Sequence, residues 1–404
     1  MLQLSNNYKL PASQLNSVAD LAVYVHYPFC KSKCPYCDFN SHLEQQTDHS
    51  LFFKGYEAEL DFFKSNLSNR NVTSIFFGGG TPSLMPVSFA DKILQKINNL
   101  WNVSSQCEVT IEANPTSFEA NKFRDFHKIG FNRLSLGIQS LNQEDLNFLG
   151  RQHTVKESIL AISQAREIFD NFSFDLIYAR PKQKINDWKI ELETAIKLGS
   201  NHLSLYQLTI EKGTKFFNDW KEKKFIMPTD KLAGDFYQNT NEIMADNGFN
   251  HYEISNYAKE NYQSVHNLSY WQGVDYIGIG AGSHSRVFFD GQKHRKAIVN
   301  LHRPDIWLEQ ALNNKAQVAI QKIEEINDDD LKEELILTGL RTIYGVDIER
   351  LNNFFNSEIF DDNILKKLVE QGFITINKQK IAIAKNYWIF ANSVIEKVVS
   401  ALKK

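Results

Sequence analysis

The sequence predicts an α/β fold: a partial (β/α)6 barrel of the TIM type, followed by a mostly helical, winged-helix-like domain. Six apolar, strand-like runs alternate with amphipathic helical stretches in the first half of the chain, and parallel strands need such crossover helices. Polar and glycine-rich residues follow the ends of these runs, where barrels and open α/β sheets place their sites. After residue 207 the alternation stops, which indicates a different architecture for the second half.

The predicted strands are short and rich in β-branched or aromatic residues. They cover residues 21–27, 74–77, 108–113, 133–138, 172–178 and 202–208. The helices predicted between them cover residues 50–64, 88–100, 119–129, 154–169 and 187–198. Nearly continuous apolar strands indicate a sheet that helices cover on at least one face.

We expect four segments along the chain. They are an N-terminal arm over residues 1–20, the barrel over 21–230, a barrel extension and connecting segment over 231–325, and the winged-helix-like domain over 326–404. The third segment should hold a helix near 230–247, a polar stretch over 258–273 and the glycine-rich run YIGIGAG at 276–282. In the last segment, FITINKQKIAIA at 373–384 predicts a hairpin. We interpret this domain as a packing or lid module, because no basic stripe accompanies it.

Composition and charge exclude several classes of protein. Hydrophobic residues make up 42% and charged residues 23% of the chain, as in globular domains. The net charge of −3 gives no reason to expect a nucleic-acid partner. No apolar run reaches the ~18 residues of a transmembrane helix, and MLQLSNNYKLPASQ lacks the basic and apolar regions of a secretory signal. We therefore expect a cytoplasmic protein.

Three of the four cysteines fall within eight residues, as Cys30, Cys34 and Cys37 in the spacing C-x3-C-x2-C. Such clustering in a chain poor in cysteine indicates metal ligation in a reducing compartment. Three thiolates on one loop can hold three irons of a [4Fe–4S] cube and leave the fourth iron open to a small molecule. Cys107 lies on the third predicted strand, and we expect it to be a buried small apolar residue.

Two other interpretations of the cysteines stay open at this point. Structural zinc would need a fourth ligand, which His26, Asp38 or His42 would supply. A disulfide with one free thiol fits less well, because the chain has no other mark of an oxidising compartment.

Residues suited to binding the open-site ligand lie on the other strands or just after their ends. Gly78–Gly79–Gly80–Thr81 allows close approach of the backbone to a ligand, through free carbonyl and N–H groups. Glu112 suits the diol of a ribose, and Gln139 and Asp175 add an amide and a second acceptor. Arg151 adds a planar cation that fits a carboxylate.

The motifs VYVHYPFCKSKCPYCDFNSH, FFGGGTPS, IEANP, LSLGIQS, LGRQH and HNLSYW resemble those of the radical S-adenosylmethionine (SAM) superfamily. Within it, the chain is most similar to the HemW/HemN group, and in that group to the haem chaperones. The resemblance runs from about residue 20 to the C-terminus. It implies that Cys30, Cys34 and Cys37 bind a [4Fe–4S] cluster whose fourth iron is chelated by SAM. Reduction of the cluster would cleave SAM to a radical, the cofactor carrying the hard chemistry. The residues implied to contact SAM are Tyr24, Tyr36, Gly79, Gly80, Thr81, Glu112, Gln139, Arg151 and Asp175.

The resemblance implies a function in haem metabolism, and two departures select between its members. The oxygen-independent coproporphyrinogen III oxidases carry a further cysteine where this chain has Phe39, and a longer N-terminal arm. Both differences favour a haem chaperone, which binds haem and delivers it to acceptor haemoproteins such as respiratory enzymes. Binding to such acceptors would bring the protein to the periphery of a membrane. The enzymatic alternative is the oxidase itself, which like any reductive SAM cleavage needs an electron donor. A zinc-stabilised nucleic-acid module is a third, weaker alternative.

The motif HNLSYW implies the haem site, with His266, Asn267, Tyr270 and Trp271 as haem-binding residues. A neutral imidazole can ligate haem iron, and aromatic rings can pack on the macrocycle. Without the resemblance, a His-aromatic cluster on a loop is more often a packing corner.

One local departure concerns the loop after the fifth strand. The family reads G-L-P-G-Q there, whereas residues 179–183 of this chain read ARPKQ. Two glycines are lost and two cations are gained near the expected mouth of the barrel. We expect a tighter loop or an altered contact with an anionic ligand.

Overall fold

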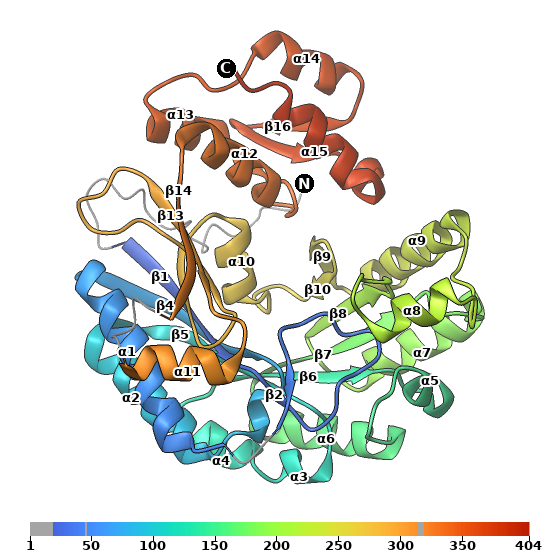
Figure 1. Ribbon diagram of the computed structural model, residues 1–404. Helices are drawn as coiled ribbons and strands as arrows, with labels where there is room; N and C mark the ends of the chain where they lie inside the picture. The colour runs from blue at the N-terminus through green and yellow to red at the C-terminus, as the bar shows by residue number, and fades with distance from the viewer. Residues whose placement is uncertain (1–18, 45–46, 314–318, 404) are drawn as a thin grey trace.

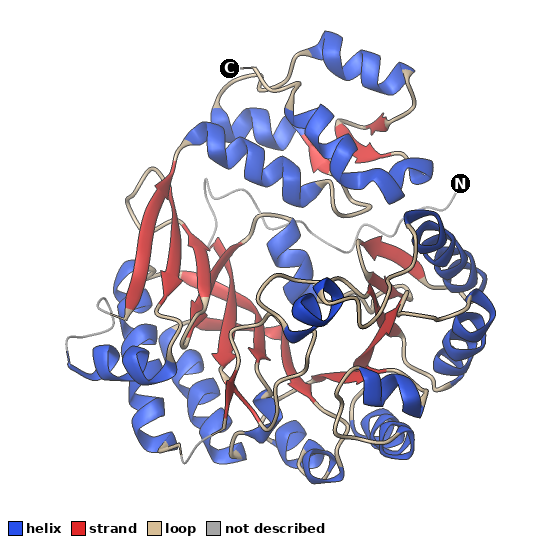
Figure 2. Ribbon diagram, turned by 45° about the vertical axis from the view of Figure 1, so that its right-hand side comes forward, coloured by secondary structure: helices blue, strands red, loops and turns tan. Residues whose placement is uncertain are grey.

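The computed structural model describes residues 19–44, 47–313 and 319–403. Figures 1 and 2 show a strongly curved sheet with helices around its outer side and a separate small domain above it. The large sheet has 12 strands in the order β14-β13-β12-β11-β1-β4-β5-β6-β7-β8-β10-β9. An α/β barrel-like fold is thereby confirmed.

The six predicted strands are present and lie side by side in chain order, all parallel. Most of their residues are buried, as expected for a sheet that helices enclose, but Ser135 and Gly137 are half-buried and Tyr206 is 41% exposed. They are β1 (Ala19–Tyr27), β4 (Arg70–Gly79), β5 (Asn102–Ala113), β6 (Arg133–Gln139), β7 (Asn171–Tyr178) and β8 (His202–Gln207).

Four of the predicted crossover helices form as expected, and side chains cap two of them. Asp48 accepts hydrogen bonds from the N–H groups of Ser50 and Leu51, and Thr154 forms a capping box with Glu157. The four are α1 (His49–Asn66), α2 (Val87–Leu100), α6 (Val155–Ile168) and α7 (Ile185–Lys197).

The helix predicted over residues 119–129 is wrong as a single element. The structure has two short helices there, α3 (Ser117–Ala120) and α4 (Phe123–Lys128). At the break, Lys122 Nζ donates to the carbonyl oxygens of Ser83 and Leu84, both at 3.0 Å, in the turn η1 (Pro82–Leu84). This tertiary contact interrupts a pattern that is helical in the sequence. Helix α5 (Gln143–Phe148) is too short to show a period and was not predicted.

The segment over 231–325 extends the sheet at both edges. After α8 (Lys215–Lys221) and α9 (Asp230–Asp246), β9 (Asn250–Glu253) and β10 (Asn256–Ala258) join β8. The glycine-rich run is largely a strand, β11 (Asp275–Ile279), parallel to β1. Gly278 is needed there, because a Cβ would lie 2.3 Å from the carbonyl oxygen of His284. The remaining elements are β12 (His284–Val287), β13 (Arg295–Asn300), α11 (Pro304–Asn313) and β14 (Ile320–Ile326).

The polar stretch over 258–273 contains a helix that was not predicted, α10 (Val265–Trp271), inside the curve of the sheet (Figure 1). Ser264 caps it, and the buried carboxylate of Glu108 on β5 accepts from the N–H groups of Val265 at 3.1 Å and His266 at 3.0 Å. A carboxylate at a helix N-terminus is stabilising. Because 158 residues separate Glu108 from His266, no local pattern announces this helix.

The C-terminal domain has its own core and a three-stranded sheet in the order β15-β17-β16. The predicted hairpin is confirmed as β16 (Ile374–Asn377) and β17 (Lys380–Ile383). The other elements are α12 (Asp328–Gly339), β15 (Val346–Asp347), α13 (Ile348–Phe355), α14 (Asp362–Glu370), the 3-10 helix η3 (Lys385–Phe390) and α15 (Ala391–Val399).

Two expectations concern the chain's ends and its relation to membranes. The predicted arm over 1–20 lies outside the described residues, apart from Ala19 and Asp20 at the start of β1. After β1, the short strands β2 (Phe29–Cys30) and β3 (His42–Leu43) form a separate two-stranded sheet. Among the helices that the structure describes, none is long and apolar enough to cross a bilayer.

Candidate functional site

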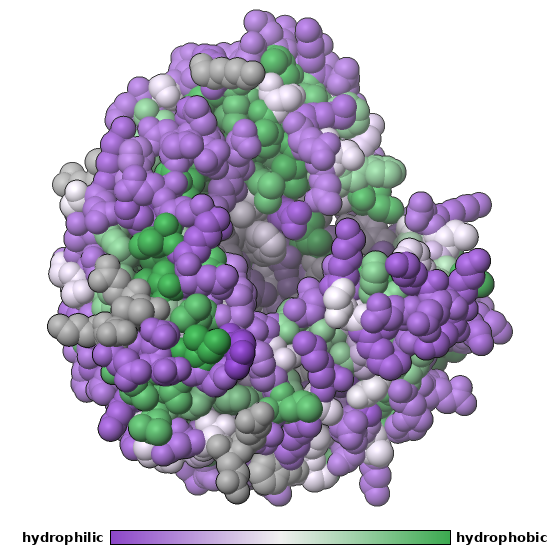
Figure 3. All heavy atoms as spheres, in the orientation of Figure 1, coloured by the Kyte–Doolittle hydropathy of each residue, from purple (hydrophilic) through white to green (hydrophobic). Residues whose placement is uncertain are grey.

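A cavity of about 1020 Å³ opens at the carboxyl ends of the central parallel strands, beneath the C-terminal domain. In Figure 3 the surface is hollowed near its centre, below that domain. Eleven of the sixteen site residues predicted from the sequence line the cavity. They are Cys30, Cys34, Tyr36, Cys37, Gly79, Gly80, Thr81, Glu112, Gln139, Arg151 and Asp175.

The three cysteines are half-buried free thiols that line the cavity, Cys30 at the end of β2 and Cys34 and Cys37 on the loop that follows it. Thr81 Oγ1 donates to Cys30 Sγ, and Arg151 Nη1 donates to Cys34 Sγ, both at 3.4 Å. Such donors stabilise thiolate, the form that binds metal. Burial raises the pKa of the Cys30 and Cys37 thiols above their ordinary value, so metal binding there must displace protons.

Three thiolates on one short stretch of chain fit an iron–sulfur cube. In the described part of the chain, no three His, Cys, Asp or Glu side chains are arranged to hold one metal ion. His26 Nε2 instead hydrogen-bonds the Asn40 carbonyl at 2.9 Å, and His42 Nε2 hydrogen-bonds Asn40 Oδ1 at 3.1 Å. Two of the three candidates for a fourth zinc ligand are thus held elsewhere. A cube places each thiolate on a different iron and needs no fourth protein ligand.

The glycine run packs the end of β4 against the cysteine loop. Gly79 has φ +108°, and a Cβ on Gly80 would lie 2.5 Å from the carbonyl oxygen of Phe29. The Gly80 N–H donates to the Tyr27 carbonyl at 2.7 Å, and the Thr81 N–H donates to that of Phe29 at 2.8 Å. Contrary to expectation, these two N–H groups serve the protein rather than a ligand. Their effect is to hold Thr81 beside Cys30.

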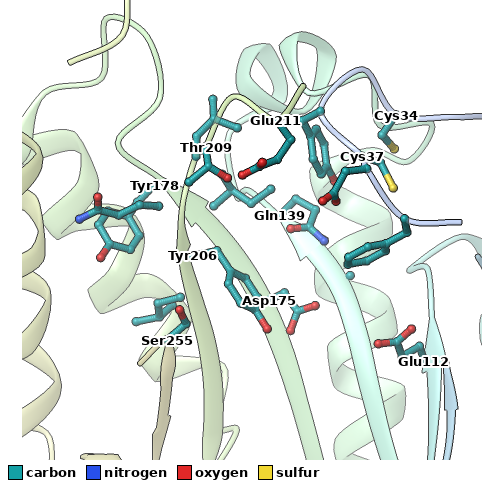
Figure 4. A pocket seen from close by; sticks show the side chains of 18 of the residues that line it. Cys34, Cys37, Glu112, Gln139, Asp175, Tyr178, Tyr206, Thr209, Glu211 and Ser255 are labelled. Carbon is teal, nitrogen blue, oxygen red and sulfur yellow. The ribbon is translucent and has the colours of Figure 1, made fainter. Parts of the chain in front are cut away.

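Glu112, Gln139 and Asp175 project into the cavity from the neighbouring strands β5, β6 and β7 (Figure 4). Burial, with the charge of Asp175 nearby, raises the pKa of Glu112 to about 8. Burial also raises the pKa of Asp175 to about 6. Arg133 opposes this rise for both groups and Arg151 for Asp175, and a cationic ligand would favour the ionised forms further by adding positive charge beside them.

Gln139 ends β6 in the left-handed region, with φ 71°, which is uncommon for a residue other than glycine. The next two residues are tied to a buried carboxylate: Ser140 Oγ donates to Glu191 Oε1 at 2.5 Å, and the Leu141 N–H donates to it at 2.7 Å. This anchor fixes the turn that directs Gln139 into the cavity.

Arg151 is largely engaged by the protein. Its Nη2 donates to Asn114 Oδ1 and, at 2.8 Å, to the carbonyl oxygen of Gly137. With its bond to Cys34, the guanidinium joins the ends of β5 and β6 to the cysteine loop. Only its buried Nε has no hydrogen-bond partner among the described residues. Asn114, which also donates to Thr81 Oγ1 at 3.2 Å, is a site residue that the sequence analysis did not assign.

Two further groups of lining residues were missed. Tyr206 and Glu211, on and after β8, share the cavity with Asp175 (Figure 4). The rule that polar residues lie at or after strand ends would have found both, since Tyr206 lies near the end of the sixth predicted strand and Glu211 follows it. No local signal identifies the C-terminal residues Arg341, Trp388, Ile389 and Phe390, which close the other side of the cavity.

Five predicted residues do not line the cavity: Tyr24, His266, Asn267, Tyr270 and Trp271. The His266 ring is buried, stacked on Phe76 at 5.0 Å between ring centroids. Its Nδ1 hydrogen-bonds Ser74 Oγ at 2.9 Å and its Nε2 hydrogen-bonds the Tyr270 hydroxyl at 2.7 Å. Burial lowers the pKa of His266 to about 3, so the imidazole is neutral. Both ring nitrogens are therefore occupied.

In the ARPKQ loop, the side chain of Arg180 does not point where the sequence analysis expected. Ala179 and Lys182, which stand where the family has glycine, adopt positive φ of 56° and 61°. Arg180 is buried and pairs with Glu191 at 2.6 Å and Asp145 at 3.0 Å. It therefore stabilises the anchor behind Gln139 and does not face an anionic ligand at the mouth.

Comparison with known proteins agrees with this geometry. Residues 24–195 match the radical SAM superfamily model. A Dictyostelium discoideum protein named radical S-adenosyl methionine domain-containing protein 1, mitochondrial, is 35% identical over 428 residues, covering 95% of this chain and 96% of its own. Heme chaperone HemW of Escherichia coli (strain K12) is 38% identical over 275 residues, covering 67% of this chain and 72% of its own. The structure of coproporphyrinogen III oxidase (HemN) from Escherichia coli superposes with a TM-score of 0.78 at 19% identity, over 95% of this chain and 91% of that one. The chain belongs to the radical SAM superfamily, in the group that holds HemW and HemN.

Proposed function

We propose that this protein is a haem chaperone that holds a [4Fe–4S] cluster and SAM in its cavity and passes haem to acceptor haemoproteins, such as respiratory enzymes. The observation that carries the proposal is one cavity with the three-cysteine loop on one side and an apolar C-terminal wall on the other. The likeness to heme chaperone HemW supports it.

In this proposal, Cys30, Cys34 and Cys37 hold the cluster, and the strand-end residues receive SAM. Glu112 and Asp175 accept hydrogen bonds and balance the cationic charge of SAM, while Thr81 and Arg151 support the thiolates. When bound, the two cofactors supply one-electron chemistry, for which an external electron donor is needed. We place the protein in the cytoplasm because its few, clustered cysteines suit a reducing compartment. We propose no nucleic-acid partner.

The haem chaperone and the porphyrinogen oxidase make opposite predictions for one assay. The oxidase has support from the fold shared with HemN, but Phe39 occupies the position of its further cysteine and is 61% exposed at the cavity. We expect the reconstituted protein, given SAM and a reductant under anaerobic conditions, to convert no coproporphyrinogen III to protoporphyrinogen IX. Product formation, read by fluorescence after oxidation, would establish the oxidase instead.

The haem ligand predicted from the sequence, His266, is testable with a pair of variants. Iron would have to replace Ser74 or Tyr270 at one ring nitrogen. We expect His266→Ala to weaken haem binding at least about tenfold, a loss of roughly 1.4 kcal/mol. Tyr270→Phe removes the hydroxyl group from Nε2 and should keep binding and the absorbance of histidine-ligated haem. An unchanged titration and spectrum in His266→Ala would exclude His266 as the ligand.

A further inference from the structure

The C-terminal wall of the cavity presents apolar side chains that the protein itself leaves uncovered. Ile389 and Phe390 at the end of η3 are 44% and 59% exposed, although both line the cavity. Their neighbour Trp388 is half-buried against His251 of β9, with 5.0 Å between ring centroids. A surface of this kind, backed by rigid rings, suits a flat apolar ligand.

Arg341, two residues beyond α12, places a cation on the same wall. Its Nη2 donates to Asn392 Oδ1 at 3.1 Å, and its guanidinium lies 5.9 Å from the ring centroid of Trp271. Its buried Nε has no hydrogen-bond partner among the described residues. A half-buried guanidinium with unused donors is suited to a carboxylate.

The acidic groups near this wall do not remove that capacity. Glu253 is close enough for Arg341 to oppose the effect of burial, which raises the pKa of Glu253 to about 7. Its carboxylate, however, accepts from the Asn256 side chain and the Ser255 N–H. Glu211 and Asp230 also line the cavity and would repel a carboxylate of a ligand, so they favour its placement at Arg341.

We propose that this wall is the haem seat: the macrocycle lies against Trp388, Ile389 and Phe390, and Arg341 binds a haem propionate. The inference rests on the proposed haem-chaperone function and adds the site that recognises the ligand's carboxylate. It also gives the HNLSYW helix a second role, because Trp271 supports the guanidinium of Arg341. Arg341 is a specificity-determining residue in this arrangement.

The test compares haem with haem dimethyl ester, whose propionates are blocked, in titrations of the full-length protein followed by Soret absorbance. We expect wild type to prefer haem over the ester by about tenfold or more. Arg341→Met should bind both forms equally, at the weaker level. Phe390→Ala should weaken both forms and keep the preference. Lys366→Met, an exposed change in the same domain away from the cavity, should match wild type.

The outcomes distinguish a failure of the haem-chaperone function from a failure of the proposed haem seat. If wild type binds neither haem nor the ester, the haem-chaperone function and the seat fail together. If wild type binds haem and the ester equally well, the protein binds haem but does not recognise its carboxylates. This result does not depend on whether the variants fold. If Arg341→Met keeps the preference for free haem, the propionate is bound elsewhere and the assignment of Arg341 is overturned.

Discussion

Cys34→Ala is expected to abolish cluster binding. Wild-type protein reconstituted without oxygen should carry about four irons per chain and absorb at about 400 nm, as thiolate-bound clusters do. The variant keeps two thiols of a site that needs three, and it also loses the acceptor of the Arg151 Nη1 hydrogen bond. We expect its iron content to fall to less than about one per chain, with loss of the visible absorbance. Iron assay and absorption spectra measure both quantities.

Cys107→Ala is the matched control for this experiment. Cys107 is buried on β5 and does not line the cavity. Its removal should leave the iron content and the spectrum as in wild type. A wild-type preparation that binds stoichiometric zinc and no iron would contradict the cluster assignment, and iron retained in Cys34→Ala would contradict the ligand set.

Arg180→Met is expected to give the largest loss of stability among single changes near the site. The substitution leaves the buried carboxylate of Glu191 without its cation, which typically costs about 3–5 kcal/mol. The turn at Ser140 and Leu141 depends on that carboxylate, so the orientation of Gln139 should loosen as well. Chemical denaturation followed by circular dichroism should show a lower midpoint than for wild type.

A second substitution separates the charge from the packing. In Arg180→Met combined with Glu191→Gln, a neutral amide oxygen can still accept from Ser140 and Leu141, and we expect part of the stability to return. Arg124→Met, at a side chain that is 72% exposed, should leave the midpoint unchanged. If the double variant is no more stable than Arg180→Met, the cost does not come from the unpaired charge.

The sequence was sufficient for the parts of the protein that are encoded in short stretches. Apolar runs of strand length, alternating with helical periods, determine β1 and β4 to β8 and their order. The spacing of Cys30, Cys34 and Cys37 determines that their thiols share one loop. The carboxyl ends of parallel strands meet at one edge of the sheet, so the sequence alone places Glu112, Gln139 and Asp175 together.

The tertiary structure decided everything that depends on partners far apart in the chain. The N-terminus of helix α10 is hydrogen-bonded by Glu108, which is 158 residues from His266 in the chain. Ser74, 192 residues from His266, hydrogen-bonds a nitrogen of the His266 imidazole. The wall of Trp388, Ile389 and Phe390 joins the site only because the C-terminal domain folds over the barrel mouth. Periodicity and ligand spacing record local geometry, whereas such contacts depend on how the finished elements pack, which no local pattern carries.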